Sequence, residues 1–492
     1  MTHPPRLNAA RLGGLPAAIE RPTYDRSHVR SGIVHLGIGA FHRAHQAVYT
    51  EDVLKSGDLA WGIVGASLRS PDTRDALAPQ DGLYTIAVRE TSGETLRVVG
   101  SILDVVVAPE DPEALIARMS DPDVAIVSLT VTEKGYCHDP ATGRLDEAHP
   151  DVVHDLANPD RPRSALGFLT AAIARRQAAG TRPFTVMSCD NLPANGQTLK
   201  GILTRFADLV SAELGQYVRQ TISFPDTMID RIVPATTDAD RRHIAGALGL
   251  TDAWPIMTEP FTQWVIEDHF VSGRPAWETV GATLVKDVAP YEAMKLRLLN
   301  GSHSALSYLG YLAGYETVAE AMADEAIAAY VAALMEDSTV TLTLPEGADV
   351  AGYKRSLIAR FRNTALKHRT WQIAMDGSQK LPQRLLGTIR DRLARGLPVE
   401  RHALAVAAWM RYVTGTDEAG EPIDVRDPLA AEFRSLADPA GQDAEKLVAA
   451  LIGVRAVFGE DLASNAVFRT AVTAALGRLF DKGAKATVAT YC

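Results

Sequence analysis

Short apolar runs alternate with helical patterns along the first half of the chain. Four runs are rich in β-branched residues and end in glycine or polar residues, as strands buried on both faces do. Helical patterns occur between them, notably at residues 112–120 and 164–180. Strands that alternate with helices predict a doubly wound α/β sheet. The four predicted strands are residues 31–39, 61–67, 124–132 and 183–191.

The second half has a different pattern, in which long alanine- and leucine-rich segments dominate. They predict a mostly α-helical domain and comprise residues 318–337, 399–413 and 443–458. Between the halves, glycine and proline residues bracket a short strand pattern at residues 277–285. We therefore expect a boundary within residues 272–290 and two domains, residues 1–285 and 286–492.

Composition narrows the function classes. The 492 residues carry a formal charge of −10 and no basic run, which argues against a nucleic-acid partner. No apolar run approaches the roughly 18 residues of a membrane-spanning helix, and the first residues lack the apolar core of a signal peptide. The three cysteines form no spaced pair, which fits a reducing compartment. We expect a cytoplasmic monomer without a membrane partner.

The first apolar run ends in a glycine motif. Gly37-Ile38-Gly39 opens a helical pattern, so the chain can turn tightly and bring backbone N–H groups near a pyrophosphate. His42 stands where the usual fingerprint has its third glycine, and Gly-x-Gly alone is weak support. Its place on the first strand of an alternating series favours a Rossmann-type dinucleotide domain. A metal at His42 and His45 is not expected, because the pair has no carboxylate partner.

Further cofactor contacts are predicted where the strands of this sheet end. An acidic residue after the second strand would hold the adenosine ribose, and Asp72 is the acid within reach. Arg69 lies close by and would instead favour a 2′-phosphate. We expect NAD rather than NADP. The expected cofactor contacts are Gly37, Gly39, Ala40, Phe41, Arg43, Asp72, Thr130 and Glu133.

Residues 291–308 place polar side chains in an otherwise apolar helical pattern. At about 100° per residue, four of them fall within an arc of roughly 140°, and these are Glu292, Lys295, Asn300 and His303. Desolvation lowers the pKa of a half-buried lysine, which makes it a candidate general acid and base. The alternative is an amphipathic helix with a solvated polar edge. The glycine of Asn-Gly-Ser-His costs about 1 kcal/mol in helix propensity, and this cost favours a site.

Several longer motifs resemble the long-chain polyol dehydrogenase family. They run in one order from about residue 30 to about residue 479 and include HLGIGAFHRAHQA, IVSLTVTEKGY, SCDNLPANG, FPDTMIDRIVP and MKLRLLNGSHS. The resemblance implies Lys295 as catalytic acid/base, with Asn191 and Asn300 holding the reacting oxygen. It further implies that His303 contacts a substrate hydroxyl and that Glu292 relays protons. Catalysis without a metal is also implied, as are Asp230 and Lys380 as substrate-binding residues.

One position departs from the mannitol dehydrogenases of this family, which carry arginine just upstream of Asp-Gly-Ser where this chain has Gln372. The surrounding residues resemble the fructuronate reductase branch, which predicts NAD-dependent interconversion of D-fructuronate and D-mannonate. A carboxylate substrate needs a cation, and the nearby basic residues are His368, Arg369, Lys380 and Arg384. We add Arg369 and Gln372 to the predicted substrate contacts. Two alternatives stay open: a mannitol 2-dehydrogenase or related polyol enzyme, and a dinucleotide-binding regulator without turnover.

Overall fold

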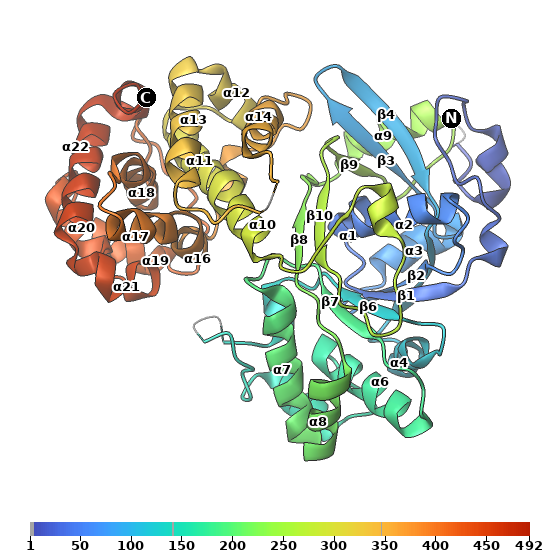
Figure 1. The fold of residues 1–492 in the computed structure, drawn as a ribbon. Helices are drawn as coiled ribbons and strands as arrows, with labels where there is room; N and C mark the ends of the chain where they lie inside the picture. Colours follow the sequence, from blue (N-terminus) through green and yellow to red (C-terminus); the bar gives the residue numbers. More distant parts are fainter. Residues whose placement is uncertain (1–3, 140–141, 346) are drawn as a thin grey trace. The chain divides into compact units, whose positions relative to one another are not determined.

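The computed structural model describes residues 4–139, 142–345 and 347–492. The chain divides into two compact units, Met1–Ala289 and Pro290–Cys492, which are described separately here. The first contains three β-sheets, and the second is helical among its described residues (Figure 1). No helix within the described residues combines the length and the apolar character needed to span a bilayer.

The main sheet of the first unit has five parallel strands and confirms the predicted α/β class. In spatial order they are β5 (Ile102–Val107), β2 (Gly62–Ser67), β1 (Ser31–Leu36), β6 (Ile126–Leu129) and β7 (Thr185–Ser188). Four of these five are the strands that the apolar runs predict.

Both faces of this sheet are buried, because successive side chains of a strand point to opposite sides. On β1, Ile33 belongs to a core cluster with Tyr49 of the neighbouring helix, whereas Val34 belongs to a second cluster with Phe168 and Leu199. The helices of this unit are α1 (Ala40–Ala44), α2 (Gln46–Lys55), α3 (Asp72–Leu77), α4 (Pro112–Ser120), α5 (Pro150–Ala157), α6 (Ala165–Ala179), α7 (Asn195–Val210), α8 (Ala212–Thr221) and α9 (Asp238–Leu248).

Local capping explains why the helical patterns predict α4 and α6 well. Asp111 accepts a hydrogen bond from the Ala114 N–H at the start of α4, and Ser164 caps α6 in the same way. Gly180 ends α6 in the left-handed conformation. Both helices therefore begin at a residue that the sequence marks, and α6 also ends at one.

Two small sheets complete the first unit. One joins β4 (Gly93–Val99), β3 (Tyr84–Glu90) and β9 (Ile256–Thr258), and the other joins β11 (Thr283–Val285), β10 (Gln263–Glu267) and β8 (Thr227–Asp230). The strand pattern at residues 277–285 is only partly a strand. Trp277–Val280 form a 3₁₀ turn whose tryptophan is buried, and Gly281 at φ 104° ends it before β11.

The second unit packs its helices around α18 (Glu400–Val413), which is buried along most of its length. Two short segments within it, η6 (Lys295–Asn300) and η7 (Pro382–Leu386), are π-helical. The remaining helices are α10 (Ala289–Met294), α11 (Gly301–Leu312), α12 (Val318–Ala323), α13 (Glu325–Thr339), α14 (Val350–Phe361), α15 (Thr370–Ala374), α16 (Gly377–Leu381), α17 (Gly387–Ala394), α19 (Ala430–Ala437), α20 (Ala444–Leu451), α21 (Arg455–Ser464) and α22 (Ala466–Val488).

Candidate active site

A cavity of about 940 Å³ lies at the carboxyl edge of the main sheet, within the first unit. Its wall contains the glycine turn after β1, the residues after β2 and the loop after β6. In an open parallel sheet this edge is where ligands bind. The wall includes Gly37, Gly39, Leu68, Arg69, Thr130 and Val131.

The glycine turn has the backbone that a dinucleotide site needs. Gly37 has φ 91°, and a Cβ atom there would lie 2.1 Å from the carbonyl oxygen of Thr130. Only glycine fits this conformation and this approach. Gly39 is the residue before α1, which has only five residues. His45 alone separates α1 from α2. The expected helix is therefore present but broken after one turn.

The residues after Gly39 are not all at the cavity. Ala40 and Phe41 are absent from its wall, and Arg43 is buried, with its guanidinium donating to the Trp254 carbonyl oxygen at 2.7 Å and lying over the Tyr84 ring. Burial lowers the pKa of Arg43 to about 10. Arg43 therefore connects α1 to the segment before β9.

Two histidines near this turn are held by different partners. His42 stacks on His35 with ring centroids 3.4 Å apart, and His45 Nε2 lies 3.0 Å from the Gln263 carbonyl oxygen. His35 contacts Ser128 and Thr130 through its two ring nitrogens, and burial lowers its pKa to about 3. His35 is therefore neutral at neutral pH.

Arg69, and not Asp72, lines the cavity beyond β2. Asp72 is exposed at the start of α3, where its carboxylate accepts a hydrogen bond from Ser70 Oγ at 2.9 Å. Ser67, Leu68, Arg69 and Thr73 form the wall at this end. The acid expected at the ribose thus lies beside the cavity wall rather than in it.

Asp190, for which the sequence motifs predict no role, holds the loop after β6. Its carboxylate accepts hydrogen bonds from the N–H groups of Val131 and Thr132 and from the Tyr136 hydroxyl. Thr132 has φ 63°, so the loop needs such support. Thr130 lies on the cavity wall, whereas Glu133 is exposed and absent from it. Burial raises the pKa of Asp190, and Asn191 follows it directly.

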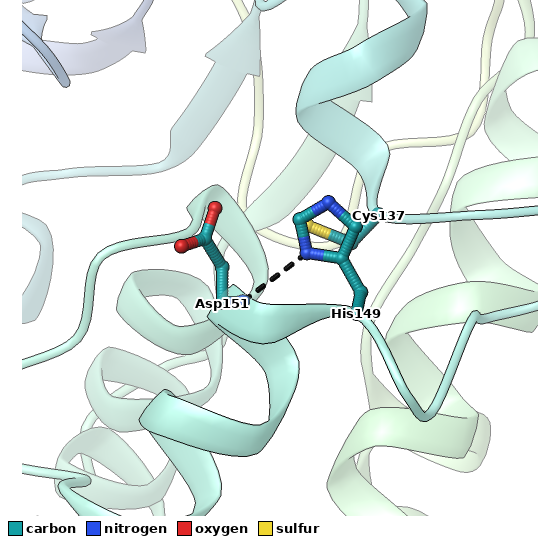
Figure 2. A group of neighbouring side chains, drawn as sticks. All are labelled: Cys137, His149 and Asp151. Carbon is teal, nitrogen blue, oxygen red and sulfur yellow. Dashed lines mark hydrogen bonds between the residues drawn. The ribbon is translucent and has the colours of Figure 1, made fainter.

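One group of three potential metal ligands occurs among the described residues, with donor atoms within 4.8 Å of one another: Cys137, His149 and Asp151 (Figure 2). His149 Nδ1 accepts the Asp151 N–H at 3.2 Å and so caps α5. Burial raises the pKa of Cys137 to about 12, and burial also raises the pKa of Cys189, while Cys492 is exposed. The imidazole thus has a structural role at the start of α5.

The second unit carries the four residues of the predicted polar helix face on three consecutive helical segments. Glu292 is on α10, Lys295 and Asn300 begin and end η6, and His303 is on α11. Lys295 and His303 are buried, at 7% and 8% exposure. The uniform α-helical spacing assumed for residues 291–308 is wrong at its centre, because η6 has the wider i→i+5 turn. Single-turn π segments frequently occur at functional sites.

The two π segments pack against each other. A Cβ atom on Gly301 would lie 2.8 Å from the carbonyl oxygen of Arg384, a residue of η7. The Arg384 guanidinium donates to Ser304 Oγ at 3.3 Å, next to His303 in sequence. The glycine of Asn-Gly-Ser-His therefore has a packing reason, which is the close approach of η7.

His303 is buried among basic groups. Burial lowers its pKa well below the usual value, and His368, Arg384, Arg360 and Lys380 lower it further. The His303 and His368 rings make an edge contact with centroids 4.9 Å apart. The structure therefore gathers cations of α14, α16 and η7 around one imidazole of α11.

The remaining predicted substrate contacts lie at different places. Lys380 donates to the Met375 and Ile373 carbonyl oxygens, at 2.6 and 3.3 Å. Arg369 is exposed and 3.6 Å from the Glu316 carboxylate, and Gln372 is exposed on α15. Asp230 is buried at the end of β8 in the first unit. Arg369 and Gln372 are thus not brought into the group around His303.

Two known domain families together match most of the chain. Residues 31–279 match the mannitol dehydrogenase Rossmann domain, and residues 287–480 match the mannitol dehydrogenase C-terminal domain. The chain belongs to the mannitol dehydrogenase family. It is therefore an oxidoreductase of that family.

Relatives within the mannitol dehydrogenase family differ in the substrates that their names give. D-mannonate oxidoreductase of Escherichia coli (strain K12) is 48% identical over 481 residues, with 96% of this chain and 98% of the relative covered. Mannitol 2-dehydrogenase of Aspergillus fumigatus is 41% identical, with 99% of each chain covered. The solved ternary complex of Pseudomonas fluorescens mannitol 2-dehydrogenase with NAD and D-mannitol has a TM-score of 0.89, 43% identity and 98% coverage of both chains.

Proposed function

We propose that this mannitol dehydrogenase family member interconverts D-fructuronate and D-mannonate with NAD as cofactor. Residues up to about 285 bind the cofactor and the helical remainder binds the substrate. The group of cations around the buried His303 supports this choice, because a hexuronate brings a carboxylate that a neutral hexulose lacks. The 48% identity to a D-mannonate oxidoreductase agrees with it.

The glycine turn fits the pyrophosphate of NAD, since a side chain at Gly37 would fill the space that backbone N–H groups need. NAD, when bound, supplies hydride transfer to and from C5 of the sugar acid. In the reducing direction Lys295 donates a proton to the oxygen at C5, and in the reverse direction it removes the hydroxyl proton. Asn191 and Asn300 donate hydrogen bonds to this oxygen as it gains charge. Glu292 relays the proton, and His303 contacts a substrate hydroxyl.

The test is NADH oxidation, followed by absorbance, with D-fructuronate and D-fructose in parallel. We expect the larger kcat/KM with D-fructuronate. Faster turnover of D-fructose would contradict the proposal and favour the second candidate, a mannitol 2-dehydrogenase, to which the 0.89 TM-score of the mannitol complex points. Turnover of neither substrate would contradict the proposal and point to another substrate for this oxidoreductase.

A further inference from the structure

Three buried imidazole nitrogens in the second unit lack a hydrogen-bond partner among the described residues, and two of them are on rings that touch. These two are Nε2 of His303 and Nδ1 of His368, and the third is Nδ1 of His402. The rings of His303 and His368 touch edge to face, and the Phe361 ring stacks on His303 with centroids 5.1 Å apart. A buried polar atom without a partner costs about 1–3 kcal/mol, so each of these nitrogens needs a partner that a water molecule or a polar ligand can supply.

The charges beside this histidine pair are positive. Arg384 reaches Ser304, the residue after His303, and it is the permanently charged group with the largest effect on the pKa of His303. Lys380 already donates to two backbone carbonyl oxygens at the end of α15. Burial and Lys380 lower the pKa of His368 to about 4, so this ring is a neutral hydrogen-bonding group at neutral pH.

A guanidinium is suited to a carboxylate, because its planar N–H groups match the two oxygens. The backbone of Arg384 packs closely against Gly301, the residue that follows η6, which fixes where η7 lies beside α11. The neutral imidazole of His368, which touches the His303 ring, can add one N–H donor. The surroundings of His303 thus offer an anion a fixed positive charge and a neutral donor.

We propose that Arg384 and His368 bind the substrate carboxylate and set the preference for a hexuronate over a neutral hexulose. The proposal rests on the proposed function, because it names the residues that would read the acid group of that substrate. Neither residue belongs to the motif-derived substrate contacts Asp230, Lys380, Arg369 and Gln372.

The experiment compares the wild-type protein with Arg384→Gln and His368→Gln, using D-fructuronate and D-fructose with saturating NADH. We expect Arg384→Gln to lower kcat/KM for D-fructuronate by about 10- to 100-fold, mainly through KM, and to change that for D-fructose by less than about 5-fold. His368→Gln should lower kcat/KM for D-fructuronate by about 3- to 10-fold. Arg362→Gln, at an exposed arginine on the same unit, is the matched control and should leave kcat/KM unchanged for both substrates.

Equal losses with both substrates in Arg384→Gln would show a structural role and overturn the proposal. A wild-type preference for D-fructuronate that survives in Arg384→Gln would overturn this assignment and leave the proposed function intact. A wild-type preference for D-fructose would overturn both. If the variant fails to fold, competition by D-mannonate and D-mannitol against D-fructose in the wild-type protein decides: D-mannonate should bind at least 10-fold more tightly, and equal binding would overturn the assignment.

Discussion

The glycine turn of the first unit and the paired π segments of the second unit both depend on a glycine, for different reasons. Gly37 has φ 91°, a conformation that disfavours any side chain, and it also meets the Thr130 carbonyl oxygen. Gly301 has an ordinary helical φ of −63°, so its need for glycine comes only from the Arg384 carbonyl oxygen. The first requirement is local to the chain, whereas the second exists only once η7 has packed. Glycines that look alike in sequence can thus report a turn or a tertiary contact.

The largest expected effect belongs to the π segment. Lys295→Ala should reduce kcat by about 10²- to 10⁴-fold, because it removes the group that exchanges a proton with the substrate oxygen. Steady-state kinetics with D-fructuronate and NADH measure kcat, and fluorescence titration with NADH should show an unchanged Kd. Near wild-type turnover at neutral pH would show that the π segment carries no acid/base residue.

The second prediction concerns the buried histidine beneath the glycine turn. The pKa of folded His35 is about 3, whereas in an unfolded chain it is near 6.5. Below pH 6 the unfolded chain therefore binds one more proton at this position, and the free energy of unfolding falls by about 1.4 kcal/mol per pH unit. Above about pH 6.5 the histidine is neutral in both states and this loss of stability is absent.

The His35→Gln variant separates the contribution of this histidine to the pH dependence of stability from the contributions of all other titrating groups. Urea unfolding of both proteins should show the stability advantage of the wild type shrinking between pH 6 and pH 4, by about 1.4 kcal/mol per unit. A difference that stays constant over this range would mean that His35 takes up its proton in the folded state.

A matched pair of alanine substitutions tests whether Gly37 and Gly301 are needed for different reasons. Gly37→Ala should lower the free energy of unfolding by about 1–3 kcal/mol, because alanine at positive φ is strained and its Cβ atom meets backbone. Gly301→Ala should lower it by less, about 1–2 kcal/mol, because its Cβ atom meets the Arg384 carbonyl oxygen but better helix propensity offsets part of that cost. Urea unfolding measures both. Equal losses would remove the distinction between a local and a tertiary requirement.

The smallest effect is expected at the ribose end of the cavity. Asp72→Asn should change the KM for NADH by less than about 3-fold, because the Asp72 carboxylate accepts from Ser70 outside the cavity wall. A rise in KM above about 10-fold would return Asp72 to the role that the motif predicts for it.

The parallel sheet could be predicted because its signals are local. Buried parallel strands need continuous apolar runs, and Asp111, Ser164 and Gly180 mark where helices begin and end. The candidate acid/base segment was found for a similar reason, since polar residues interrupt an apolar helix.

The details that sequence could not supply depend on neighbours far along the chain. Nothing in residues 295–300 distinguishes a π turn from an α turn, because the packing partner, η7, is more than 80 residues away. Arg69 and Asp72 are three positions apart, and only the course of the chain into α3 decides which one faces the cavity. The role of Asp190 could not be predicted, because its carboxylate accepts hydrogen bonds from backbone N–H groups of the loop that follows a different strand, β6.

The burial of two of the three cysteines has a practical consequence for attaching a fluorescent dye to the protein. Cys137 and Cys189 are buried thiols with raised pKa values, and thiolate is the reactive form, so both react slowly while the protein is folded. Cys492 is exposed at the end of the chain. A maleimide dye should therefore label one defined position of the native sequence, giving a fluorescent reporter on the helical unit without replacing any residue.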